Sequence, residues 1–208
     1  MNIEIRKLTP NLAEDYAIFF DITPHDNNVD AHKCYCVCWC NDDYEGKDFS
    51  SREKRRSAAI QYVKGSNIQG YLAYYNNEII GWCNANTKSD CLKCCSWRRQ
   101  MGDVPTEEES PDIKVKSVFC FTISPDMKRK GIATQLLERV CKDAADDGFD
   151  FVEAYTDKEP VDENINFSGL INLYKKCGFT LHYETKDKLI MRKPLKGTSN
   201  NSVNFLLV

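Results

Sequence analysis

The most constraining feature of this 208-residue sequence is a strand, a turn and a helix at its centre. Residues 115–123 (VKSVFCFTI) are β-rich and nearly continuous in apolar residues toward their end, as in a strand buried on both faces. Ser124-Pro125-Asp126 breaks this run. Residues 131–147 then repeat apolar side chains at helical spacing until Gly148, which predicts an amphipathic helix.

Shorter patterns surround this central unit. Alternating apolar residues predict strands, and apolar residues at helical spacing predict helices. The expected strands are 3–8, 70–75, 78–86, 115–123, 149–155, 179–183 and 189–192. The expected helices are 12–20, 51–64, a short one around 92–99, 131–147 and 167–176. This order predicts an α/β (α+β) fold with a mixed sheet, whereas the acidic run Glu107–Glu109 is expected to be solvated.

The start of the central helix has the properties of an anion site. The first N–H groups of a helix have no partner inside it, and the helix dipole adds positive charge there. Gly131 lets a phosphate approach the backbone, and Lys128, Arg129 and Lys130 add cationic charge. These features together suit a pyrophosphate. The alternative is an ordinary solvated helix start.

This segment resembles motif A of the GNAT superfamily of acetyltransferases, [Gln/Arg]-x-x-Gly-x-[Gly/Ala]. Lys128 takes the first position, Gly131 the fourth and Ala133 the sixth, and the lysine keeps the cationic charge. The resemblance implies a mostly antiparallel mixed sheet flanked by helices, with acetyl-CoA as co-substrate. It also implies that backbone groups in two segments bind the coenzyme: Phe121, Thr122 and Ile123, then Lys128, Arg129, Lys130, Gly131, Ile132, Ala133 and Thr134.

A second resemblance lies downstream. Residues 173–179 (LYKKCGF) are similar to the L-Y-x-K-x-G-F segment of GNAT enzymes, whose tyrosine commonly protonates the departing thiolate of coenzyme A. Tyr174 takes that position. A phenol with a pKa near 10 keeps its proton at neutral pH and can donate it to a thiolate. The alternative for Tyr174 is a core aromatic on a short helix.

The resemblance extends over roughly residues 3–192. Gly70–Tyr74, Ile80–Cys83 and the Cys-rich segment 34–39 are similar to an uncharacterised GNAT subgroup, which brings no substrate with it. We therefore expect one GNAT domain over residues 1–196 and a tail over 197–208. For the apolar end of the tail three alternatives stay open: pairing with a sheet edge, packing on a second subunit in a homodimer, or disorder.

The expected reaction is acetyl transfer to an amine of a small molecule or peptide. The amine must lose a proton to a base, and a backbone N–H on the central strand could stabilise the oxyanion that forms. Glu153 is the candidate base, because its strand is expected to diverge from the central one. The alternative is a structural strand carboxylate. A non-catalytic acyl-CoA-binding module is the competing function.

Charge and composition limit the partners. The net charge is −3 at pH 7, and a nucleic-acid binder usually carries a basic excess, so we expect no nucleic-acid partner. No run of roughly 20 apolar residues suggests a membrane span, and the N-terminus lacks the apolar run of a secretory signal. We therefore expect a cytoplasmic protein without a membrane partner.

Eleven cysteines are expected to be thiols in that compartment. Cys34, Cys36, Cys38 and Cys40 alternate, so an extended chain would direct all four to one face. This one-residue spacing fits zinc ligands poorly, so we expect no metal and favour packing around the acceptor pocket, lined by Trp39, Trp82 and Tyr35. A structural zinc site and a redox sensor are the alternatives.

Overall fold

The computed structural model describes residues 1–23, 29, 33–159 and 166–195. Its seven-stranded sheet has the order β1-β2-β3-β4-β5-β7-β6. Only β4 and β5 are parallel, and the other neighbours are antiparallel, which confirms the mixed, mostly antiparallel sheet. The strands are β1 (Glu4–Lys7), β2 (Gly70–Tyr75), β3 (Glu78–Thr87), β4 (Val115–Ile123), β5 (Phe151–Asp157), β6 (Thr180–Glu184) and β7 (Lys188–Pro194).

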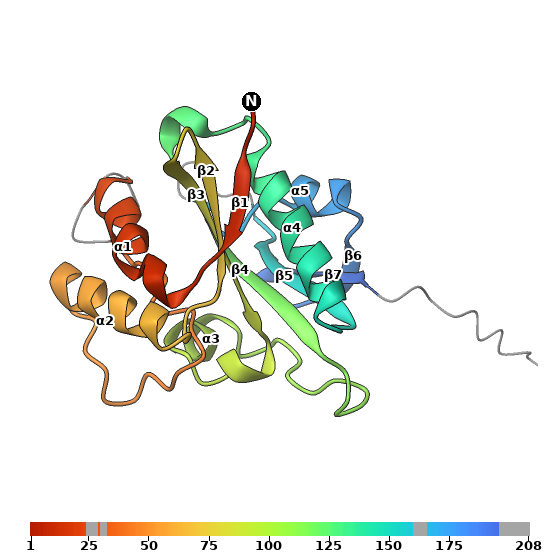
Figure 1. Ribbon diagram of the computed structural model, residues 1–208. Coiled ribbons are helices and arrows are strands. Elements are labelled where there is room, and N and C mark those ends of the chain that lie inside the picture. Colours follow the sequence, from red (N-terminus) through yellow and green to blue (C-terminus); the bar gives the residue numbers. More distant parts are fainter. Residues whose placement is uncertain (24–28, 30–32, 160–165, 196–208) are drawn as a thin grey trace, which may run out of the picture.

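Helices cover both faces of the sheet (Figure 1). On one face lie α1 (Ala13–Ile22) and α2 (Arg52–Lys64), whose core includes Tyr16, Phe20 and Trp82. On the other lie α4 (Ile132–Asp146) and α5 (Ile171–Lys176), whose core includes Leu136, Val140 and Tyr174. The remaining helices are α3 (Cys95–Gln100) and the 3-10 turns η1 (Pro10–Leu12), η3 (Ser89–Cys91) and η4 (Pro125–Met127). No helix in the described ranges is long and apolar enough to cross a lipid bilayer.

Local sequence signals account for most element boundaries. The β2–β3 turn has positive φ angles at Asn76 (+50°) and Asn77 (+66°), as a two-residue hairpin turn requires. Ser51 caps α2 by accepting a hydrogen bond from the Lys54 amide. Gly148, at φ +79°, follows the end of α4.

A bulge in β4 separates it from β5. Asn84 of β3 lies opposite Cys120, but the next residue, Ala85, lies opposite Val118, so Phe119 is an extra residue. Its ring is stacked between those of Trp39 (centroids 4.5 Å apart) and Tyr155 (5.5 Å). Pairing of β4 with β5 ends at Val118–Ala154, while β5 continues along β7. Because a bulge bends and twists its strand, β4 diverges from β5 beyond this point. We call this opening the splay.

Two expectations differ from the structure. The helix expected over 167–176 begins only at Ile171, because Gly169 adopts φ +83°, which a right-handed helix does not allow. The Cys-rich segment is not extended either: Tyr35 and Cys36 have φ near +50°, and the chain turns there. Its four cysteines therefore do not share one face. The expected tail, 197–208, lies outside the described residues.

Candidate active site

The start of α4 presents backbone amides without a capping side chain. Gly131 occupies the N-cap position at φ +79°, and the first amide with an intrahelical bond is that of Gln135, which donates to the Gly131 carbonyl. Within the described part of the chain, the amides of Ile132, Ala133 and Thr134 have no hydrogen-bond partner. A Cβ built on Gly131 would meet nothing within 4 Å, so the space in front of these amides is open. Phosphate oxygens fit such a site.

Cationic side chains surround these amides. Lys128, Arg129 and Lys130 form the turn that leads into α4, and they are at least partly exposed. Arg129 has φ +61°, a left-handed conformation that is uncommon outside glycine. The turn therefore combines two left-handed residues, open amides and three cations. We call residues 128–134 the cradle.

Phe121, Thr122 and Ile123 form the end of β4, which Ser124 and η4 connect to the cradle. The Phe121 amide points away from β3 into the splay, where it donates to the Phe167 carbonyl at 2.6 Å. Phe167 belongs to residues 166–170, which lie between β4 and β5 and which we call the strap. A role of these backbone groups in coenzyme binding stays a prediction, and the Phe121 amide has a partner from the chain itself.

Tyr174 is fully buried on α5, in the core beside α4. Its hydroxyl donates to the Ser168 carbonyl of the strap. Burial raises the pKa of this phenol well above its usual value of 10. Tyr174 is thus a protonated hydroxyl close to the splay, and it is also a core aromatic, so the two sequence interpretations of this residue are compatible.

Glu153 lies in a buried ion cluster. Its carboxylate, with an exposed fraction of 0%, accepts hydrogen bonds from Arg192, and Lys88 Nζ lies 3.0 Å from its other oxygen. Glu108 bridges the same cations, at 2.8 Å from Lys88 and 2.9 Å from Arg192. Two carboxylates and two cations balance one another. Within the described residues, neither Tyr174 nor the strap contacts Glu153 through a hydrogen bond or ion pair.

Each charge in this cluster is stabilised by its neighbours. Burial would raise the pKa of Glu108, but hydrogen bonds from Lys88 and Arg192 hold it below its usual value. Burial would lower the pKa of Arg192, and Glu153 and Glu108 raise it. The expectation that Glu108 is solvated is therefore wrong: only 14% of its side chain is exposed, because two buried cations require a second carboxylate. No sequence pattern points to this pairing, which joins residues far apart in the chain.

The cysteines pack in the core. All eleven are free thiols, and only Cys34 and Cys38 are partly exposed. Cys36 Sγ accepts a hydrogen bond from Trp82 Nε1 at 3.3 Å. Trp82 and Tyr35 are fully buried, so only the partly exposed Trp39 is placed to border an open pocket. Among the described residues, no group of three or more His, Cys, Asp or Glu side chains is arranged to hold a metal ion.

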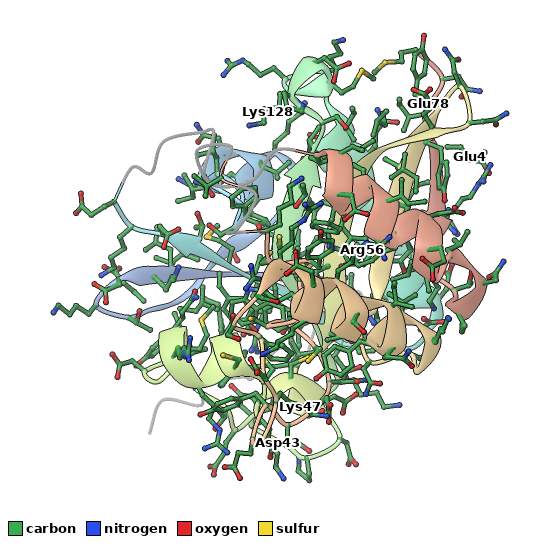
Figure 2. The ribbon with its side chains drawn as sticks, turned by 90° about the vertical axis from the view of Figure 1, so that its left-hand side faces the viewer. Glu4, Asp43, Lys47, Arg56, Glu78 and Lys128 are labelled. Carbon is green, nitrogen blue, oxygen red and sulfur yellow. The ribbon has the colours of Figure 1, made fainter. Side chains whose placement is uncertain are left out.

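A groove of about 550 Å³ opens beside the cradle, between α1, the β2–β3 hairpin and η4. Its charged lining residues are all acidic: Asp15, Glu78 and Asp126. The rest of the lining is mostly apolar, with the polar residues Thr23, Asn77 and Ser124 among it. Ile18 (50% exposed) and Ile22 (73%) are the lining residues of α1 with the largest exposed apolar side chains. Figure 2 shows Glu78 and Lys128 at the same end of the molecule, whereas Asp43 and Lys47 lie at the opposite end.

Replacing Glu108 by glutamine should destabilise the protein at neutral pH, because Lys88 and Arg192 then share a single carboxylate. We expect a loss of about 3 kcal/mol in the free energy of unfolding at pH 7, measured by urea denaturation. Because the folded pKa of Glu108 is depressed, its contribution is complete above the unfolded pKa near 4.5 and is lost as the pH falls through the folded value. The deficit should therefore shrink in acid.

The control is Glu107→Gln, which changes an exposed neighbour. Equal stability of the two variants at pH 7, or a deficit of Glu108→Gln that does not shrink toward pH 3, would contradict this description of the cluster.

Residues 35–179 match the family described as Acetyltransferase (GNAT) family. No curated protein sequence gives a significant match. Among solved structures, the chain is similar to the PaiA N-acetyltransferase of Thermoplasma acidophilum in complex with coenzyme A. The TM-score is 0.53 at 16% identity, covering 93% of this chain and 99% of the other.

Two further structures have the same fold. The GNAT domain of S. lividans PAT gives a TM-score of 0.56 at 15% identity, covering 93% of this chain and 90% of the other. A GNAT-family acetyltransferase from Streptococcus pneumoniae gives 0.52 at 15% identity, covering 94% and 100%. The likeness to the Cys-rich subgroup stays a prediction. Because the family model matches residues 35–179, which make up more than half of the chain, the chain belongs to the GNAT family of acetyltransferases and is an acyltransferase.

Proposed function

We propose that this protein transfers an acetyl group from acetyl-CoA to a primary amine. The observation that carries the proposal is the start of α4, where an open Gly131 and three cations meet amides that have no hydrogen-bond partner among the residues described. These features fit a pyrophosphate, and the end of β4 leads from the cradle into the splay, where a pantetheine arm would lie. When bound, the thioester supplies an activated acetyl group. The protein's own residues orient it and manage protons.

The Phe121 amide is the proposed donor to the acetyl oxygen. It points into the splay, and a backbone N–H held by the sheet needs no reorganisation when charge develops on that oxygen. Tyr174 is the proposed acid for the departing thiolate. Its raised pKa keeps the proton on the hydroxyl at neutral pH, as this role requires.

A role for Glu153 stays a prediction, and its surroundings argue for a structural role. Arg192 and Lys88 contact the two oxygens of the carboxylate in the interior of the protein. An amine would also have to enter a cluster in which those two cations already hold the carboxylate oxygens.

The acidic groove supports an amine acceptor. Asp15, Glu78 and Asp126 make no ion pair within the described residues, so their charge is available to attract a cation. The apolar lining suits a substrate with a hydrophobic body. Because the groove borders Ser124–Asp126, between the end of β4 and the cradle, we propose that it attracts and holds the acceptor. A cytoplasmic location, a homodimer and the absence of a nucleic-acid partner stay predictions.

A non-catalytic acyl-CoA-binding module is the second candidate. It is favoured by one observation: the Phe121 amide and the Tyr174 hydroxyl are both paired with carbonyls of the strap. Coenzyme binding without release of thiol to any member of a broad amine panel would support this second candidate.

Substituting Gly131 by alanine should weaken acetyl-CoA binding at least tenfold, because the new Cβ enters the open space in front of the amides. Calorimetry of acetyl-CoA binding provides the measurement. Gly148→Ala is the matched control, since Gly148 also has φ +79° and open space but lies beyond the other end of α4. Both variants should lose about 1 kcal/mol of stability. Equal coenzyme affinity in the two variants would contradict the cradle.

Tyr174→Phe should lower kcat about 100-fold without abolishing coenzyme binding, because general acid catalysis is lost while the ring stays in the core. Thiol release with the best acceptor of an amine panel measures kcat. Tyr75→Phe, on β2, is the control and should retain wild-type activity. A Tyr174→Phe enzyme with unchanged kcat would exclude this acid.

The double variant Glu78→Gln, Asp126→Asn should raise KM for a cationic acceptor about three- to tenfold, with a smaller change in KM for acetyl-CoA. Steady-state kinetics at low and high salt test this, and the difference should narrow at high salt as the charges are screened. Asp43→Asn, at the opposite end of the molecule, should behave as wild type. An unchanged acceptor KM would remove the groove from the acceptor site.

A further inference from the structure

The strap is bonded to all three elements that line the splay, through three consecutive carbonyl groups. The Phe167 carbonyl accepts from the Phe121 amide of β4 at 2.6 Å. The Ser168 carbonyl accepts from the Tyr174 hydroxyl of α5. The Gly169 carbonyl accepts from Thr156 Oγ1 of β5 at 2.8 Å. The strap therefore closes the gap that the bulge in β4 opens.

Side chains outside the proposed chemistry help to hold the strap. Ser168 Oγ lies 3.1 Å from Asp157 Oδ2 on β5. Gly169 has φ +83°, and a Cβ there would lie 2.8 Å from the Tyr174 hydroxyl, so the close approach of strap and tyrosine requires glycine. The Phe167 side chain packs against the core beneath α1 and α2. The strap thus has a defined conformation in which the carbonyl groups of residues 167–170 all accept hydrogen bonds.

The hydrogen bonds to the strap occupy donors that the coenzyme would need. The two donors assigned to the acetyl oxygen and the thiolate are the Phe121 amide and the Tyr174 hydroxyl, and adjacent strap carbonyls occupy both. An amide N–H that already donates at 2.6 Å has no capacity for a second acceptor of equal strength. The thioester and the strap therefore compete for the same two donors.

We propose that the strap, residues 166–170, is a lid that closes the acyl end of the coenzyme site and that acyl-CoA must displace it. On displacement, the acetyl oxygen replaces the Phe167 carbonyl at the Phe121 amide, and the sulfur replaces the Ser168 carbonyl at the Tyr174 hydroxyl. This inference rests on the proposed function. Because each donor exchanges one acceptor for another, displacement is reversible, and the apparent affinity for acetyl-CoA is reduced by the fraction of molecules with the strap open.

Loosening the strap should therefore strengthen coenzyme binding. Thr156→Val removes the hydroxyl that holds the Gly169 carbonyl, and Ser168→Ala removes the contact with Asp157. Loss of one hydrogen bond from the closed state should tighten the apparent Kd for acetyl-CoA roughly two- to tenfold in each variant, measured by calorimetry.

Thr180→Val is the matched control. Thr180 is also a strand threonine whose hydroxyl donates to a backbone carbonyl, that of Arg192, but it lies on β6 and outside the splay. It should bind acetyl-CoA as the wild type does. Tighter binding also separates a lid from a merely structural role, because a variant that only loosens the fold is not expected to gain affinity.

The affinities of these variants for acetyl-CoA test whether the strap is a lid. Tighter binding by Thr156→Val and Ser168→Ala supports the lid, as does binding by these variants when the wild type shows none. Wild-type or weaker affinity in both variants overturns the lid and leaves the proposed function standing. No binding by the wild type or any variant overturns both.

Discussion

The extra residue in β4 is the constraint on which the site depends. Phe119, stacked between Trp39 and Tyr155, shifts the register of β4 against β3 and coincides with the end of its pairing with β5. A regular parallel pair would have consumed the amide of Phe121 in the sheet. The bulge directs that amide into a gap between two strands instead, close to the end of β4.

Charge is divided across the molecule in a way that suits acyl transfer. Cations gather at the start of α4, where a diphosphate would bind, and the carboxylates of Asp15, Glu78 and Asp126 line the neighbouring groove, which suits an amine. The buried carboxylates of Glu153 and Glu108 are neutralised by Lys88 and Arg192 and tie β5, β7 and the segment before β4 together. They secure the sheet beside the splay, whereas the groove and cradle remain open to ligands.

The parts of the fold that depend on short-range sequence patterns can be predicted from the sequence. The strand–turn–helix around Gly131 and the mixed sheet are confirmed, because apolar periodicity and glycine placement determine them over short distances. The strap and the ion cluster were missed. Phe167–Leu170 continues a helical pattern. The left-handed Gly169 and the hydrogen bonds from β4 and β5 to the strap carbonyls override that pattern. Glu108 and Arg192 meet across 84 residues, and an acidic run carries no sign of such a partner.

An amide-resolved NMR titration with coenzyme A tests the central claim most directly, with pantetheine, which lacks the diphosphate, as the comparison ligand. The account predicts that coenzyme A shifts the amide resonances of Ile132, Ala133 and Thr134 more than those of any other part of α4, and that pantetheine leaves these three unchanged. Saturating coenzyme A that leaves the first turn of α4 unperturbed, or pantetheine that perturbs it equally, would contradict the account.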